Sequence, residues 1–230
     1  MKKQAFRRAF LDTVPVLTGY LFLGMGFGIL LAESGYGVGW AFCMSLFVFA
    51  GSGQYLAVEL LSGGASLISS AIATLLVNAR HLFYGISLLD TYKKSGWKKP
   101  YMIFALTDET YSLVTQNQPP EGMTRHQYCF TVSVLDHIYW ICGCTLGALA
   151  GTYIPISFEG VDFVLTALFV TLFVEQWLST KNHLPAIIGV MSTAICLAIF
   201  GAEIFLIPSM VLIAICLTVT RKTGRRQENA

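Results

Sequence analysis

Residues 14–32 read VPVLTGYLFLGMGFGILLA, nineteen residues without a charged side chain. A helix of about 20 apolar residues is long enough to cross the hydrocarbon core of a bilayer. The whole chain has the same character, because 55% of its 230 residues are hydrophobic and 12% are charged. Soluble domains carry about 25% charged residues. The stretch therefore predicts a membrane helix, and its apolar run is longer than the roughly 7 to 15 residues of a signal peptide core.

Further apolar stretches follow along the chain. They cover residues 40–61, 67–89, 129–153, 163–177, 186–200 and 204–219, with a weaker candidate at 102–116. Short polar connections such as residues 62–66 leave no room for another domain. The sequence thus predicts an all-α polytopic membrane protein of seven to eight membrane segments, folded as a single transmembrane permease domain over residues 1–230.

The basic residues are clustered. Twelve of the fifteen lie in three groups: Lys2, Lys3, Arg7 and Arg8, then Lys93, Lys94, Lys98 and Lys99, and finally Arg221, Lys222, Arg225 and Arg226. Clusters of this kind between membrane segments are typical of cytoplasmic loops. No basic face interleaved with aromatic residues is present, which argues against nucleic-acid binding.

Two topologies are compatible with these clusters. Eight plain crossings would place the cluster of residues 93–99 outside the cell, against the usual bias. If the segments that contain Gln54 and Gln176 are broken or re-entrant, all three clusters become cytoplasmic. A weak repeat supports the second arrangement, since Phe47-Val48 through Gln54-Tyr55-Leu56 recurs 122 residues later as Phe169-Val170 through Gln176-Trp177-Leu178. The first three and the fifth to seventh segments would then form inverted repeats, as in many transporters.

Polar residues within apolar stretches are costly and often mark a transport pathway or a pairing partner. The candidates for substrate binding are Gly51, Ser52, Gly53, Gln54, Asn78, Arg80 and His81, and those for an ammonium group or a coupling proton are Asp108 and Glu109. A further set comprises Asp136, His137, Glu175 and Gln176.

Each candidate has a structural alternative. The glycines at 51 and 53 allow a helix to unwind so that backbone amides meet a carboxylate, or they serve close helix packing. Arg80 pairs with a carboxylate or extends toward the membrane surface. Asp136 lies inside a helix or, if that helix begins nearer Ser133, complements its dipole.

No GxSxG, HExxH or GxxxxGK(S/T) motif is present, so the sequence predicts neither an enzyme nor ATP-driven transport by this chain. The six cysteines fall in apolar segments, and we expect packing roles, with no metal and no cofactor. A small-solute transporter is the leading interpretation. An ion or solute channel and an intramembrane enzyme are the alternatives.

Three blocks resemble the AzlC family of branched-chain amino-acid exporters. Phe49-Ala50-Gly51-Ser52-Gly53-Gln54-Tyr55 is similar to the FAGSAQF block of that family, Asn78-Ala79-Arg80-His81-Leu82-Phe83-Tyr84-Gly85 to its N-x-RH-x-x-YG block, and Thr107-Asp108-Glu109 to its TDE block. Gly53 and Tyr55 replace the usual alanine and phenylalanine. The resemblance implies a multi-pass permease of the cytoplasmic membrane that exports apolar amino acids together with a small membrane protein of the AzlD type.

Overall fold

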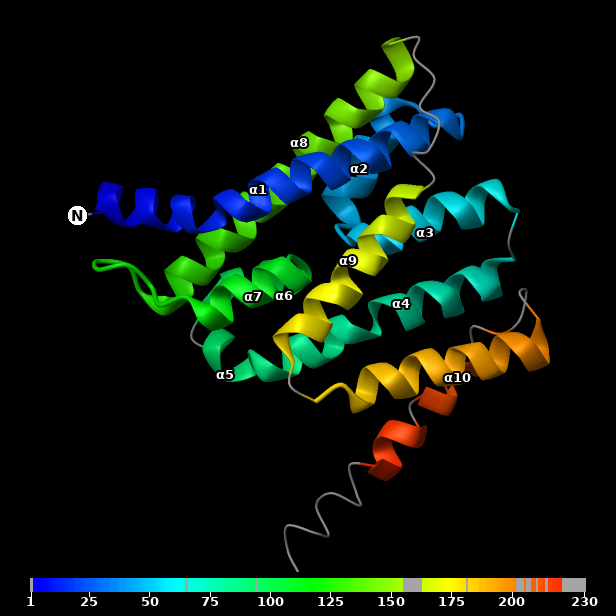
Figure 1. The fold of residues 1–230 in the computed structure, drawn as a ribbon. Helices are drawn as coiled ribbons and strands as arrows, with labels where there is room; N and C mark the ends of the chain where they lie inside the picture. The colour runs from blue at the N-terminus through cyan, green and yellow to red at the C-terminus, as the bar shows by residue number, and fades with distance from the viewer. Residues whose placement is uncertain are drawn as a thin grey trace, which may run out of the picture. The chain divides into compact units, whose positions relative to one another are not determined.

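The computed structural model describes residues 2–64, 66–93, 95–154, 163–180, 182–201, 205, 208–209, 211–213 and 215–220. Every regular element in them is a helix, which confirms the predicted all-α class (Figure 1). The helices are α1 (Lys2–Glu33), α2 (Val38–Phe47), α3 (Gly51–Ser62), α4 (Leu67–Ser87), α5 (Leu89–Tyr92), the 3₁₀ turn η1 (Gly96–Lys98), α6 (Lys99–Phe104), α7 (Asp108–Gln116), α8 (Arg125–Tyr153), α9 (Phe163–Ser179) and α10 (Leu184–Phe200). Residues 211–213 and 215–220 are also helical.

Two of the predicted stretches are each divided into two helices. Residues 40–61 form α2 and α3, and residues 102–116 form the end of α6 and all of α7. The segment that contains Gln176 is one continuous helix, α9, so it is not broken, and whether it is re-entrant stays a prediction. The second divided segment is the weak fourth one. By length and composition, residues Lys3–Glu33 of α1 and Arg125–Tyr153 of α8 are able to span a membrane.

The chain divides into two compact units, residues 1–166 and 167–230, which are described separately. In the second unit, the rings of Trp177 and His183 stack at 4.1 Å where α9 leads into α10. Apolar side chains such as Ile187, Val190 and Met191 are about half exposed along α10. An exposed apolar helix face of this kind suits contact with lipid or with other membrane helices.

The first unit is built around close contact between α1 and α8. Gly24 and Gly28 of α1 face Gly143 and Gly147 of α8, and a Cβ atom at any of them would lie against the backbone of the other helix. At Gly143 that atom would lie 2.6 Å from the carbonyl oxygen of Tyr20. Small residues let membrane helices approach in this way, so that van der Waals contact holds them together.

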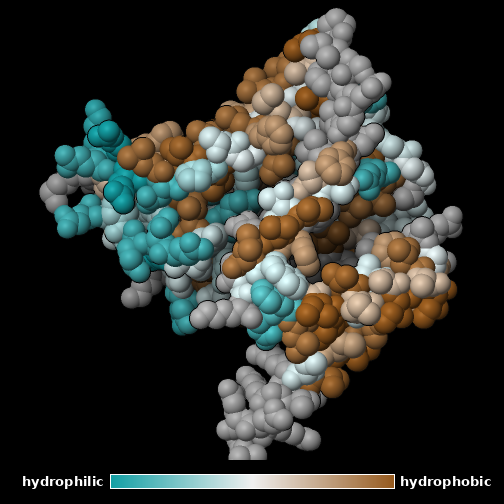
Figure 2. Space-filling model, in the orientation of Figure 1, coloured by the Kyte–Doolittle hydropathy of each residue, from teal (hydrophilic) through white to brown (hydrophobic). Residues whose placement is uncertain are grey.

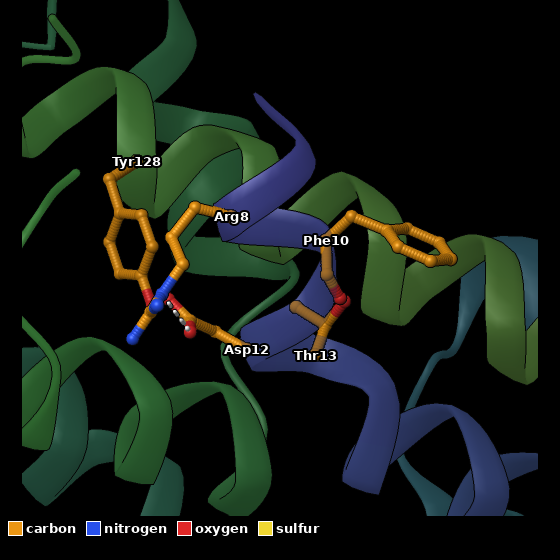
Figure 3. A network of polar contacts seen from close by, with 5 residues as sticks. All are labelled: Arg8, Phe10, Asp12, Thr13 and Tyr128. Atoms are coloured by element: carbon orange, nitrogen blue, oxygen red, sulfur yellow. Dashed lines mark hydrogen bonds and ion pairs between the residues drawn. The ribbon is translucent and has the colours of Figure 1, made fainter. Parts of the chain in front are cut away.

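The two helices run in the same direction (Figure 1). Near their first turns the Tyr128 hydroxyl donates to Asp12 at 3.1 Å, and Arg8 pairs with the same carboxylate at 3.5 Å (Figure 3). Near their last turns Gly151 of α8 meets Ile29 of α1. The start of α1 and the start of α8 therefore lie at one end of the unit, which we call the basic end.

The loop after α4 returns to the basic end. Tyr92 packs in one apolar cluster with Ala9 and Tyr128, and Lys98 lies 4.4 Å from the ring of Phe130. Hydrophilic side chains gather over this end in the space-filling view (Figure 2). The basic cluster of residues 93–99 thus shares its end with the basic start of α1.

Helices α2 and α3 form a hairpin that enters from the opposite end. It turns at Val48–Ala50, where Phe49 has a φ of 41° and stacks on His137 at a centroid distance of 4.4 Å. The chain then turns back, and the Tyr55 hydroxyl donates to the Leu23 carbonyl at 2.7 Å. The hairpin therefore reaches only partway along α1 and α8.

Helices α6 and α7 form a second hairpin, which enters from the basic end. Met102 and Val114, in its two arms, belong to the same apolar cluster as Ala9. Its turn, Ala105–Thr107, reaches the level of Tyr20 in α1. Arg125 donates from its guanidinium to the carbonyl oxygen of Val114, which satisfies an acceptor that the end of α7 leaves open.

Candidate functional site

The turns of the two hairpins meet beside the α1–α8 pair, where each contacts both helices. The rings of Phe49 and Phe104, one beside each turn, lie 6.4 Å apart. Tyr20 of α1 contacts Phe49 at 6.4 Å and hydrogen-bonds Thr107 of the other turn at 2.6 Å. The sequence blocks of residues 49–55 and 107–109, more than fifty positions apart, are thus brought to one place.

Gln54 is held in a defined orientation at this place. Its side chain is fully buried, and its Oε1 accepts from the indole nitrogen of Trp140 at 2.8 Å and from the amide of Ala50 at 3.3 Å. Two donors on one side fix which end of the amide faces them. The Nε2 group, with two protons to donate, has no hydrogen-bond partner among the described residues.

Gly53 brings the second sequence block into contact with the first. A Cβ atom at Gly53 would lie 2.8 Å from the side-chain nitrogen of Asn78 in α4. Asn78 donates to the carbonyl of Thr74 at 2.9 Å and accepts nothing at its Oδ1 within the part of the chain described. The absence of a side chain at Gly53 therefore leaves room for this asparagine.

Thr107 caps α7 and begins a chain of polar contacts. Its hydroxyl accepts from the amide of Thr110 at 3.2 Å and lies 3.1 Å from the Thr110 hydroxyl, to which it can donate. The Tyr20 hydroxyl donates to Glu109 at 2.8 Å, and the Thr110 hydroxyl donates to Asp136 at 2.6 Å. Two acids from different helices are therefore connected through hydroxyl groups.

Asp136 lies well inside α8, which begins at Arg125. The interpretation in which a helix starting near Ser133 places this acid in its first turn is therefore wrong. Asp136 is fully buried, its Oδ2 accepts from Thr110, and its Oδ1 has no partner in the described ranges. Isolated buried carboxylate oxygens are costly, so an unused acceptor at this position points to a cation or a proton.

His137 forms hydrogen bonds with both hairpins. Its Nε2 lies 3.2 Å from the carbonyl of Ser45 in α2, and its Nδ1 lies 2.9 Å from the hydroxyl of Tyr101 in α6. Because a carbonyl only accepts, Nε2 carries the proton and Tyr101 donates to Nδ1. Both ring nitrogens are thus used, which supports a structural role for this histidine.

The other predicted residues are placed less fully. Ser52 is buried in the first turn of α3, Asp108 begins α7, and the ring of His81 lies 3.1 Å from the carbonyl of Asn78 in its own helix. The side chains of Arg80, Glu175 and Gln176 lie outside the described residues.

Sequence reasoning missed Tyr20, Thr110 and Trp140. Tyr20 and Trp140 are aromatic residues with a polar tip inside apolar stretches, where such a tip needs a partner. Thr110 stands three positions after Thr107, the spacing of a helix cap. These signals are common in membrane helices and do not single out a site.

Comparison with known proteins gives the family context. Residues 15–154 match the family model described as AzlC protein. The branched-chain amino acid transport protein AzlC of Bacillus subtilis strain 168 is 41% identical over 97% of this chain and 88% of its own length. An uncharacterized membrane protein of Helicobacter pylori 26695 is 44% identical over 95% and 96%, and the inner membrane protein YgaZ of Escherichia coli K12 is 24% identical over 90% and 86%. No solved structure matches.

Proposed function

Because the chain belongs to the AzlC family, we propose that it transports branched-chain and similar apolar amino acids. It is a membrane protein of the inner, cytoplasmic membrane, as the names of its relatives indicate. The name of the Bacillus subtilis relative supports the substrate class. The relatives are named as transport and membrane proteins, which agrees with a chain that is not an enzyme.

The buried amide of Gln54 carries the proposed binding site. Its Nε2 offers two unused donors, and Gln54 itself lies in the first turn of α3, which begins at Gly51. Helix N-termini and amide donors favour negative charge. We assign the substrate carboxylate to Gln54 and the first turn of α3, with Arg80 and Asn78 on the neighbouring helix as further contributors.

The ammonium group of the substrate needs an acceptor, and Asp136 supplies one at Oδ1. Asp136 and Trp140 are four residues apart on α8, so they share one face of the helix. Trp140 in turn holds Gln54. Asp108 and Glu109, in the first turn of α7, remain the proposed sites for a coupling proton or for the ammonium group.

The rings around the hairpin turns supply the apolar surface for the aliphatic side chain. The ring of Tyr20 contacts those of Phe49 and Trp140, and the ring of Phe49 also contacts that of Phe104. Apolar pockets separate aliphatic side chains by only about 1 to 3 kcal/mol per methylene. We therefore expect transport of leucine, isoleucine and valine alike.

For the topology, we propose that both hairpins are re-entrant, so that α1, α4 and α8 cross the membrane in the first unit. Two findings support this: the hairpins enter from opposite ends, and the cluster of residues 93–99 shares its end with the start of α1. The two basic clusters of the first unit would then both be cytoplasmic, as the charge bias favours. The predicted stretch of residues 204–219 lies only partly within the described residues, and the basic cluster of residues 221–226 lies outside them.

The family resemblance adds direction and partner. We propose export, driven by protons, as the large subunit of a two-component permease with a small AzlD-type membrane protein. Residues 1–230 would act as one permease domain.

Efflux of radiolabelled leucine from preloaded cells, with and without the small partner, tests the function. Gln54→Glu keeps the acceptor for Trp140 but replaces the two donors with an anionic oxygen, so we expect efflux to be lost at normal membrane levels. Gln116→Glu, on the exposed end of α7, is the matched control and should behave as the wild type. Wild-type cells that export no leucine with the partner present would refute the proposed function.

A further inference from the structure

The side chains at the hairpin turns form one continuous chain of hydrogen bonds. Glu109 is bonded to Tyr20 at 2.8 Å, Tyr20 to Thr107 at 2.6 Å, Thr107 to Thr110 at 3.1 Å, and Thr110 to Asp136 at 2.6 Å. A carboxyl group stands at each end, and hydroxyl groups fill every position between them. Tyr20, Thr107, Thr110 and Asp136 are all at least nine-tenths buried, which keeps the middle and the inner end of the chain away from water.

This hydrogen-bond chain contains one proton fewer than its hydrogen bonds require. Three hydroxyl groups supply three protons, but four hydrogen bonds must be filled. With both acids ionised, Tyr20 donates to Glu109 and Thr110 donates to Asp136, so Thr107 can fill only one of the two bonds that remain. One added proton, on either acid, completes every bond.

We propose that this chain is a relay that carries a single proton between Glu109 and Asp136. The proposal deepens the proposed transport function and rests on it for its physiological meaning. A proton on Glu109 passes to the Tyr20 oxygen, the Tyr20 proton to Thr107, the Thr107 proton to Thr110 and the Thr110 proton to Asp136 Oδ2. The net result is one proton moved and three neutral hydroxyl groups with reversed orientation.

The two ends differ in their surroundings. Glu109 is partly exposed, whereas Asp136 is fully buried, so Glu109 is the end at which the proton enters. The negative charge of Glu109 acts on Asp136, and that of Asp108 acts on Glu109. The neutral hydroxyl groups of Tyr20 of α1, Tyr101 of α6 and Tyr139 of α8 lie within range of one or both of these carboxylates. Neither Glu109 nor Asp136 forms an ion pair within the described residues.

The relay gives a physical basis for coupling. An ammonium group at Asp136 needs the ionised carboxylate, and a proton at the same carboxyl removes that charge. Substrate and proton therefore exclude each other at Asp136, so the protein exchanges one for the other. An inward proton gradient would then drive the amino acid outward.

Infrared difference spectroscopy of the purified full chain, recorded across a pH titration, tests the relay without any transport. The carboxyl signal that Asp136→Asn removes identifies Asp136. In the wild-type background, Glu109→Gln should shift the titration of that signal. In a Thr110→Val background, where the hydrogen-bond chain is interrupted, only the direct electrostatic effect of Glu109 on Asp136 remains. The shift should therefore become smaller, and Thr110→Ser should restore its full size.

Two further variants complete the test. Tyr20→Phe interrupts the hydrogen-bond chain at another position and should also make the shift smaller, so the relay remains testable if Thr110→Val does not fold. Thr115→Val, on the exposed face of α7, is the matched control and should keep it. A shift that is equal in the wild type and in Thr110→Val would overturn the relay. Absence of leucine transport with intact spectroscopic coupling would count against the transport function instead.

Discussion

Replacing Gly143 by alanine should push α1 and α8 apart. The new Cβ atom would lie 2.6 Å from the carbonyl oxygen of Tyr20 and 3.1 Å from the Cα of Leu21. Comfortable contact between such atoms needs about 3.5 Å. Both neighbours are backbone atoms, which cannot rotate away, so the helices themselves must separate by close to an ångström at this point.

The cost follows from the overpacking of a tight interface, about 1 to 3 kcal/mol. Alanine also favours a helix over glycine by up to about 1 kcal/mol, which would hide part of this cost. Gly19→Ala on α1 provides the correction, because nothing lies within 4 Å of the Cβ atom at Gly19. The difference in free energy of unfolding between the two variants therefore measures the overpacking alone.

The assay is unfolding of the purified protein by sodium dodecyl sulfate in mixed micelles, followed by tryptophan fluorescence. We expect Gly143→Ala to be less stable than Gly19→Ala by the overpacking cost given above. Equal stability of the two variants would show that α1 and α8 do not pack through their glycines.

Three further predictions follow from the site and the topology. Trp140→Phe removes one of the two donors that orient Gln54, a hydrogen bond worth about 0.5 to 1.5 kcal/mol. The KM for leucine should therefore rise roughly 2- to 10-fold. An unchanged KM would show that Gln54 does not bind the substrate. In a cysteine-free background, an impermeant maleimide should label Leu67→Cys in intact cells and Trp97→Cys only after permeabilisation; the reverse would favour eight plain crossings. Arg8→Ala should change the free energy of unfolding by less than about 1 kcal/mol because its side chain is 73% exposed, and a larger loss in the same detergent titration would contradict this.

Hydropathy was sufficient to predict the helical membrane class. The uncharged run of residues 14–32 lies in one long helix, and the glycines at 51 and 53 lie in the first turn of α3, directly after the helix break at Val48–Ala50. The charge clusters also favoured one broken segment in the first half. Local sequence carries such information because helix length and unwinding depend on neighbouring residues.

The position of the second helix break could not be predicted from the sequence in the same way. The weak repeat pointed to Gln176, whereas the break lies at Ala105–Thr107. The short polar run of Thr107, Asp108 and Glu109, which the sequence indicates as a site, is also the start of helix α7. A cap at Thr107 explains both, because its hydroxyl accepts from the Thr110 amide.

The links within the site were even less predictable. Tyr20 and Glu109 are 89 positions apart, and Gln54 and Trp140 are 86 apart. Which residues meet across such distances depends on the packing of α1 against α8, and a single sequence contains no record of it. The glycines that set this packing stand four positions apart on each helix, a spacing that identifies an interface but not its partner.

The depth at which the two hairpins turn has an electrical consequence. Tyr20, which joins both turns, lies roughly midway between Arg8 near the start of α1 and Glu33 at its end. A membrane potential of about 100 mV does about 2.3 kcal/mol of work on a charge that crosses the whole membrane, and roughly half of that on one that stops midway. Each proton would therefore cross about half of the membrane potential before it reaches the hairpin turns and the other half after it leaves them. The transport rate should then depend on voltage as well as on pH.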